Sequence, residues 1–291
     1  MLIEEVRKLT PHERFLYWIK ERRKILFAKR KGVKKPWTDD IILQNNYFTN
    51  VCREDDKVTR WFRENIRDPL RDSSRVVFAT VAFRWFNYIP TGRFIIYQSR
   101  PSLFVEWDLG KALETLEKCK KVNGKVFTGA FNISNSGSTK PKINRVCEDY
   151  IQPVWENREC LITNMRNSNT LKRAFDHLRC LPGLGGSGFM AAQVVCDLAY
   201  TSVLDQAVDF YTWCSWGPGS KRGMNRLHGY PENHHMSKPV WESNLEKLRK
   251  EVLKSLGLRL HARDLQNCLC EFSKYERGLE GTRLKRRYPG K

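Results

Sequence analysis

The stretch Leu181-Pro182-Gly183-Leu184-Gly185-Gly186-Ser187-Gly188 separates two apolar runs with helical spacing, residues 171–178 and 189–200. Glycine adopts positive φ at little steric cost and lets backbone come close to another surface. Two helices joined in this way form a helix-hairpin-helix, whose turn can direct several N–H groups at one anion. An ordinary helical hairpin, with glycines that only permit tight packing, is the alternative. In the first interpretation, the residues that contact a phosphate are Gly183, Gly185, Gly186 and Ser187.

The charge of the chain favours an anionic partner. Its 291 residues include 52 Lys and Arg against 32 Asp and Glu, which gives a formal net charge of +20. Such an excess of positive charge attracts polyanions, and nucleic acid is the first candidate. Hydrophobic residues make up 41% of the chain, which is enough for a sizeable core. The sequence therefore predicts a folded protein that binds DNA.

Cysteine usage and hydropathy indicate the compartment. The nine cysteines are an odd number scattered through helix-like segments, which is typical of reduced thiols in the cytoplasm. No run approaches the roughly 18 apolar residues of a membrane span, and the start of the chain lacks a signal-peptide pattern. No Cys/His pair lies at zinc spacing, so His234-His235 predicts a polar loop and no metal site is expected. We expect a cytoplasmic monomer that does not contact a membrane.

Helical patterns run through most of the chain. Thr10-Pro11-His12-Glu13 offers a capping box with proline at the first helical position, and predicts a helix to about residue 31. The apolar spacing predicts further helices, among them residues 41–53, 109–121, 143–156, 241–256 and 261–278. The sequence predicts a mainly helical, all-α fold. We expect residues 1–291 to form one compound domain, with the hairpin at about 170–200 and a basic tail at 282–291.

One of these predicted helices, residues 41–53, is rich in aromatic and amide side chains. Asn50 is three residues from both Tyr47 and Arg53, so the three would share one helical face. A ring can stack on a heterocycle, and an amide or guanidinium can read the edge of a base. The alternative is a structural network that pairs Arg53 with a neighbouring carboxylate. The predicted base pocket consists of Tyr47, Phe48, Asn50, Arg53, Glu271 and Lys274.

Three aspartates that follow the hairpin are candidates for catalysis. Asp197 falls three residues after Val194, on an apolar helical face where a carboxylate needs a hydrogen-bonding partner or an altered pKa. Asp205 and Asp209 lie in the next segment. Each of the three could supply a negative charge to a reaction on DNA.

A second glycine-containing turn, Gly217-Pro218-Gly219, precedes two cations. It repeats the combination of backbone N–H groups with positive charge, so we expect DNA contacts from Gly219, Ser220, Lys221 and Arg222. The chain contains no G-x-x-x-x-G-K-[ST] sequence, the loop that cradles nucleotide phosphates. This absence argues against a phosphate-transferring kinase.

Several motifs together resemble the helix-hairpin-helix DNA glycosylase superfamily, in which an aspartate about 20 residues after the hairpin faces a flipped nucleotide. Counted from Leu181, that aspartate is Asp205. The more specific resemblance is to the branch that includes the helical domain of 5-hydroxymethyluracil DNA kinases and the alpha-glutamyl/putrescinyl thymine pyrophosphorylases, where the motif aspartate corresponds to Asp209. The motifs that carry it span about residues 15–288 and are Pro36-Trp37-Thr38, Phe48-Thr49-Asn50-Val51-Cys52-Arg53-Glu54-Asp55, Thr59-Arg60-Trp61, Asp197-Leu198, Asp209 with Gly217-Pro218-Gly219, and Leu269-Cys270-Glu271-Phe272-Ser273-Lys274-Tyr275.

The resemblance implies a two-lobed fold with a basic groove and a pocket for an extruded nucleotide. The first hypothesis is a DNA glycosylase that excises a hydroxymethyl-derived pyrimidine from phage-type DNA, in antiviral defence. Asp209, Asp205 or Asp197 would stabilise the oxocarbenium-like sugar or activate water, with no cofactor. The alternative is a transferase that attaches an amine or amino acid to an activated 5-hydroxymethylpyrimidine in DNA, and a non-catalytic DNA-binding module is the second alternative. The expected partner is double-stranded DNA that carries modified bases.

Overall fold

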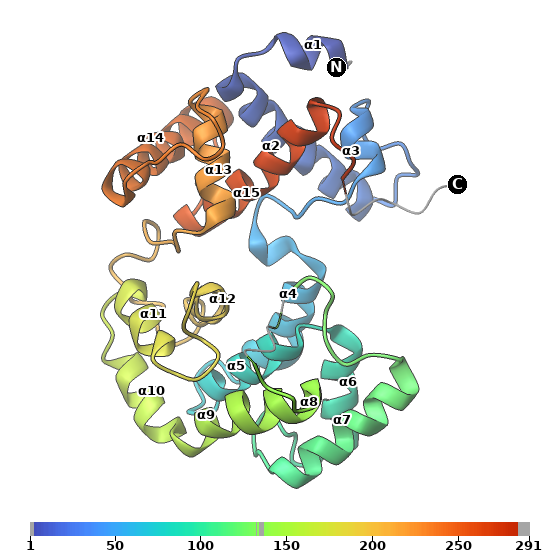
Figure 1. Ribbon diagram of the computed structural model, residues 1–291, viewed down its shortest axis with the longest axis vertical. Coiled ribbons are helices and arrows are strands. Elements are labelled where there is room, and N and C mark those ends of the chain that lie inside the picture. Colours follow the sequence, from blue (N-terminus) through green and yellow to red (C-terminus); the bar gives the residue numbers. More distant parts are fainter. Residues whose placement is uncertain (1–2, 132, 134–136, 285–291) are drawn as a thin grey trace. The chain divides into compact units, whose positions relative to one another are not determined.

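The computed structural model describes residues 3–131, 133 and 137–284 (Figure 1). These residues form helices and turns without a β-strand, so the predicted all-α fold is confirmed for them. The chain divides into two compact units, of which unit 1 combines Met1–Asp56 with Tyr211–Lys291 and unit 2 is Lys57–Phe210. None of the described helices combines the length and the apolar character needed to cross a bilayer. Residues 285–291 of the predicted basic tail lie outside the described residues.

Unit 1 brings together helices from the two ends of the sequence, seen as blue beside orange and red in Figure 1. Helix α2 begins at the predicted capping box, where the Glu13 N–H donates to Thr10 Oγ1 and the Thr10 N–H donates to the Glu13 carboxylate. Trp18, Trp241 and Phe272 are fully buried in the shared core. The elements of unit 1 are α1 (Ile3–Lys8), α2 (Pro11–Arg30), α3 (Ile41–Asn45), the 3-10 turn η1 (Arg53–Asp55), α13 (Pro218–Leu227), α14 (Lys238–Leu256) and α15 (Ala262–Leu279).

Unit 2 is arranged around α5, whose 11 residues are all buried. A helix that is apolar on every side needs neighbours on every side, and here η2, α6, α9, α10 and α12 pack against it. The elements of unit 2 are α4 (Lys57–Phe62), the π-helical turn η2 (Arg63–Arg67), α5 (Val76–Phe86), α6 (Ile89–Gln98), α7 (Leu109–Asn123), α8 (Lys142–Arg145), the π-helical turn η3 (Val146–Ile151), α9 (Gln152–Glu156), α10 (Arg158–Arg166), α11 (Leu171–Arg179) and α12 (Phe189–Leu198).

The prediction of a single helix over residues 41–53 is wrong. Helix α3 ends at Asn45, and Asn46 has extended backbone angles, with φ of −124° and ψ of 145°. Residues 47–52 are not helical, and the chain turns again only at η1. The physical reason is tertiary, because side chains of α2 and α15 bind the backbone of this segment. Tyr47, Asn50 and Arg53 therefore do not share a helical face.

Candidate functional site

The two helices that flank the glycine-rich turn are present as α11 and α12, and the turn comprises residues 180–188. Gly183 and Gly186 have φ of 74° and 58°. A Cβ on Gly183 would lie 2.7 Å from both Trp85 and Tyr150, whereas nothing lies within 4 Å of that position on Gly186. Tight packing therefore accounts for Gly183. Gly186 and Ser187 are exposed and nothing crowds Gly186, so a ligand can reach this part of the turn.

Gly185 is restricted by a contact and not by its backbone angle. The φ of Gly185 is not positive, and a Cβ on this residue would lie 3.0 Å from the Arg179 carbonyl oxygen. The same arginine donates from Nη2 to the Gly186 carbonyl over 2.9 Å. The end of α11 and the middle of the turn therefore hold each other in place.

The carboxylate of Asp197 is fully buried and engaged by Arg84. Arg84 Nε and Nη2 lie 2.5 and 2.8 Å from its two oxygens. Nη1 of the same guanidinium donates to Asn87 Oδ1 over 2.7 Å. Bidentate pairs of this kind fix the position of both partners. The pair joins α5 to α12 and so gives Asp197 a structural function in the core of unit 2.

Asp205 and Asp209 have different partners. Arg71 Nη2 lies 2.9 Å from Asp205 Oδ2, in a partly exposed ion pair. Asp209 accepts hydrogen bonds from the backbone N–H groups of Leu171 and Lys172, at 2.6 and 3.1 Å. Negative charge is favourable at a helix N-terminus, so Asp209 stabilises the start of α11. The structure thus places the three predicted catalytic aspartates in three separate contacts, and their catalytic role stays a prediction.

The predicted base-pocket residues of α15 bind protein backbone. The Glu271 carboxylate accepts from the Thr49 N–H over 3.2 Å, and Lys274 Nζ donates to the Tyr47 carbonyl. One and two turns earlier, Asn267 Nδ2 donates to Thr49 Oγ1 over 2.9 Å and Asp264 accepts from the Arg53 N–H over 3.0 Å. Positions three and four apart lie on one helical face, so a polar stripe of α15 holds residues 47–53 extended.

The aromatic and amide residues of the predicted base pocket are dispersed. Phe48 is 7% exposed and packs edge-on against Trp18 and Tyr275 in the core of unit 1. Asn50 donates from Nδ2 to the Asp55 carbonyl over 3.0 Å, while Tyr47 is 44% exposed. Phe48 does meet the predicted pocket residue Lys274, whose Nζ lies 4.2 Å from the centre of the Phe48 ring.

Asp56, which follows this segment, is a carboxyl in an unusual environment. Its Oδ1 accepts from the Asn50 N–H over 3.0 Å. Burial raises the pKa of Asp56 to about 6, although the Asn50 hydrogen bond and the Arg53 guanidinium oppose that rise. The carboxyl therefore titrates closer to neutrality than an exposed aspartate does.

The second glycine-containing turn begins α13, with Gly217 as the N-cap and Pro218 in the first turn. Gly219 faces α15, because a Cβ there would lie 2.8 Å from Cys270 Sγ. Ser220 is fully buried and donates to the Gly217 carbonyl over 2.9 Å. These two residues therefore serve helix packing. Lys221 and Arg222 instead line a pocket of about 390 Å³, together with His234, His235 and other residues of unit 1.

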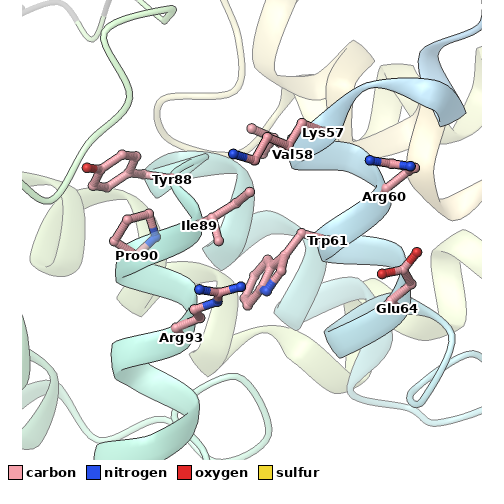
Figure 2. Close-up of a pocket in the computed structure, with 9 residues that line it drawn as sticks. All are labelled: Lys57, Val58, Arg60, Trp61, Glu64, Tyr88, Ile89, Pro90 and Arg93. Atoms are coloured by element: carbon pink, nitrogen blue, oxygen red, sulfur yellow. The ribbon is translucent and has the colours of Figure 1, made fainter. Parts of the chain in front are cut away.

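One pocket in unit 2 was not predicted as a site. It has a volume of about 610 Å³ and lies between α4 and the start of α6 (Figure 2). Its position depends on Gly92, where a Cβ would lie 2.3 Å from the Trp61 ring, so only glycine lets that indole lie against α6. The residues that line it are Lys57, Val58, Arg60, Trp61, Glu64, Tyr88, Ile89, Pro90 and Arg93. We call this the α4–α6 pocket.

The α4–α6 pocket combines aromatic surface with positive charge. Trp61 and Tyr88 provide rings, and Lys57, Arg60 and Arg93 provide three cations against the single carboxylate of Glu64. Rings beside cations suit a nucleotide, since the base stacks and the phosphates need positive charge. A volume of about 610 Å³ is within the range of small-molecule sites. The sequence did contain a signal, because Thr59-Arg60-Trp61 is one of the motifs that carry the family resemblance.

Within the described residues, no group of three or more His, Cys, Asp or Glu side chains could hold a metal ion. His234 instead lies against the Tyr230 ring, with a centroid separation of 4.4 Å. The cysteines carry no disulfide among the described residues, and burial raises the pKa of the Cys268 thiol well above its ordinary value. The rings and cations of the α4–α6 pocket support recognition of an aromatic, anionic molecule.

A family model described as "5-hmdU DNA kinase, helical domain" matches residues 10–282, which include both the α4–α6 pocket and the hairpin. The chain belongs to this family. A 5-hmdU DNA kinase of Bacillus phage SP10 is 26% identical over 287 residues, covering 88% of this chain and 44% of the relative. The chain thus spans less than half the length of that curated relative. No solved structure matches.

These comparisons confirm the 5-hydroxymethyluracil DNA kinase branch of the resemblance and overturn the excision hypothesis. The family and the phage relative are named for a kinase, which transfers a group, so the assignment as a hydrolytic DNA glycosylase is wrong. The transferase alternative agrees better with them. The missing G-x-x-x-x-G-K-[ST] loop does not exclude phosphoryl transfer by a protein of the relative's kind, because the relative is more than twice as long as its matched region.

Proposed function

We propose that this chain binds DNA and receives a 5-hydroxymethylpyrimidine for a transferase that modifies that base. Membership of the helical-domain family over residues 10–282 supports the substrate class. The observation that carries the proposal is the α4–α6 pocket, in which two rings and three cations surround a space of about 610 Å³. Double-stranded DNA with modified bases remains the expected partner.

In this proposal the α4–α6 pocket takes an extruded nucleotide. The partly exposed Tyr88 offers a ring on which a pyrimidine can stack, which offsets part of the cost of unstacking it from the duplex, while Trp61 is 8% exposed and forms part of the pocket wall. Lys57, Arg60 and Arg93 are exposed at the rim, where they can bind the flanking phosphates. The exposed Gly186 and Ser187 of the hairpin, also in unit 2, are candidates for a further backbone contact with DNA.

The transferred group would be accepted by the hydroxymethyl oxygen of the base. In phosphoryl transfer that oxygen loses its proton and forms a bond to phosphorus. At the same time the bond between phosphorus and the leaving oxygen of the donor breaks. The chain has no G-x-x-x-x-G-K-[ST] loop. We therefore assign DNA and base recognition to these residues, and no donor-binding loop of this type.

The test is a binding comparison between duplexes that contain 5-hydroxymethyluracil or thymine at one position. Fluorescence anisotropy should show tighter binding of the modified duplex by about tenfold, the value of one added hydrogen bond of about 1.4 kcal/mol. Arg93→Ala, which removes a rim cation, should weaken binding of both duplexes. Lys118→Ala removes the same charge from α7, where Lys118 pairs with Glu114 and lies outside the α4–α6 pocket, and should change neither. Equal affinity for both duplexes would overturn the proposal.

The chemistry is tested separately with labelled donors. The protein is incubated with 5-hydroxymethyluracil DNA and γ-labelled ATP, and separately with a labelled amino acid and DNA whose hydroxymethyl oxygen carries a phosphate as the leaving group. Label on the DNA from ATP would agree with the name of the phage relative. Label from the amino acid would support amine or amino-acid transfer, the form of the alternative that the sequence suggested.

A further inference from the structure

A second cationic pocket lies beside the first in unit 2. It has a volume of about 310 Å³ and is formed by the end of α7, the segment after it and the start of α8. Three lysines surround an apolar floor that includes Phe127 and Ile143, and the lysines are Lys120, Lys125 and Lys142. We call this the α7–α8 pocket.

The two pockets share a wall. Lys125 lines the α7–α8 pocket, and its Nζ lies 4.8 Å from the centre of the Tyr88 ring, which lines the α4–α6 pocket. The segment that follows Lys125 is fixed to α5 and α6, the helices on either side of Tyr88. Thr91 Oγ1 of α6 donates to the Val126 carbonyl over 2.7 Å. The Thr128 N–H donates to the carbonyl of Phe86, at the end of α5, over 2.9 Å. The neighbouring position of the pockets is therefore built into the fold of unit 2.

The α7–α8 pocket repeats the chemistry of the α4–α6 pocket. Lys142 Nζ lies 4.9 Å from the centre of the Phe127 ring. Partial burial and the nearby Arg145 guanidinium lower the pKa of Lys142, so a negative group beside it would be favourable. Lys120 has a carboxylate partner, Glu117, at 3.8 Å, and among the described ion pairs Lys125 and Lys142 have none. In proteins that bind single-stranded nucleic acid, bases stack on aromatic rings and the phosphates contact the cations between them.

We propose that the α7–α8 pocket holds the nucleotide next to the one received by the α4–α6 pocket, on the same DNA strand. The proposal rests on the proposed function for the identity of the first nucleotide. Lys125 and Lys142 bind phosphate, and Phe127 provides the apolar surface for the neighbouring base. The α7–α8 pocket holds the strand without reading the modification, because its polar contacts are lysines that recognise charge.

The experiment compares three ligands on the whole chain: a thymidine oligonucleotide, the same oligonucleotide with one 5-hydroxymethyldeoxyuridine, and the 5-hydroxymethyldeoxyuridine monophosphate alone. The double variant Lys125→Ala/Lys142→Ala should weaken binding of both oligonucleotides about tenfold. The slope of log affinity against log salt should become shallower by about 1.4, or about 0.7 for each phosphate that a lysine no longer neutralises. Binding of the monophosphate and the ratio of the two oligonucleotide affinities should not change.

Two matched variants separate the possible failures. Lys118→Ala on α7 removes a lysine that lies outside both pockets. If this variant loses as much oligonucleotide affinity as the double variant loses for each of its two lysines, the effect is one of net charge alone and the inference is overturned. An unchanged affinity in the double variant, with a loss in Arg93→Ala, would overturn the inference and leave the proposed function standing. Absence of any preference for the modified base, with oligonucleotide binding still weakened only by the double variant, would overturn the proposed function and support the second subsite. Circular dichroism melts of all variants should match the parent.

Discussion

The Arg84–Asp197 pair is the residue-scale interaction on which unit 2 most depends. Both side chains are at most 2% exposed, and removal of one partner leaves the other charge buried. We expect Asp197→Asn to lower the free energy of unfolding by about 3 kcal/mol or more. Asp205→Asn, which breaks the partly exposed pair with Arg71, should cost less than about 1 kcal/mol. Urea denaturation measures the free energy of unfolding of both variants. Similar losses for the two variants would contradict the structural function of Asp197.

Asp56 should make stability depend on pH. Its pKa is about 6 in the folded protein and about 3.8 when exposed, so the folded state retains a proton that the unfolded state releases between these values. Stability falls with rising pH where the folded state binds more protons. The contribution of Asp56 is therefore complete below about pH 4 and lost by about pH 6. Asp56→Asn keeps an oxygen for the Asn50 N–H and should flatten this decline. Urea midpoints measured at pH 4, 5 and 6 test this dependence. An equal change of the midpoint with pH in the variant and the parent would contradict it.

At the scale of elements, local signals predicted helices well. The capping box at Thr10 and Glu13 is contained in four residues, and α2 begins there and ends at Arg30, close to the expected end. The helices on both sides of the glycine-rich turn also formed where their apolar spacing placed them. In each case the information lies within a few turns of the chain, because capping and amphipathic spacing are local properties.

Segments fixed by distant partners could not be predicted in this way. Residues 47–53 carry a helical pattern, yet their backbone groups bind Glu271 and Asp264, which are more than 200 positions later. The α4–α6 pocket was missed for the same reason, because it depends on Trp61 meeting Gly92 on another helix. The types of residue in the site, aromatic and cationic, were expected. Their positions were not, since side-chain direction follows from packing and not from spacing alone.

The glycine-rich turn allows an element-scale test of packing against ligand contact. Gly183→Ala should destabilise unit 2 by several kcal/mol, because its Cβ would collide with Trp85 and Tyr150 at positive φ. Gly186→Ala meets no atom and should cost only about 1 kcal/mol for its left-handed backbone. If the turn contacts phosphate, Gly186→Ala should nonetheless weaken DNA binding. Thermal melts and anisotropy distinguish the two effects, and unchanged DNA affinity would leave the turn as a packing device.

At the scale of the whole molecule, the net charge of +20 should dominate the strength of DNA binding. For about six phosphate contacts, affinity should fall about a thousandfold between roughly 50 and 200 mM salt. Arg222→Glu should weaken binding to every sequence, as expected of a phosphate contact. Lys250→Glu reverses one charge on α14 beside Glu246 and is the matched control. Salt-insensitive binding, or equal losses in both variants, would contradict this assignment.

The arrangement of unit 1 also determines the order in which the protein can fold during translation. Helices α1, α2 and α3 leave the ribosome before unit 2, but Trp18 lies in a core completed by α14 and α15, which are synthesised after all of unit 2. Domains generally fold as soon as their residues have emerged, so unit 2 can fold while the nascent α2 still exposes its apolar residues. A messenger truncated before Phe272 would therefore yield a protein with a complete α4–α6 pocket, whereas its helices α1 to α3 would lack their core partners and be prone to aggregate.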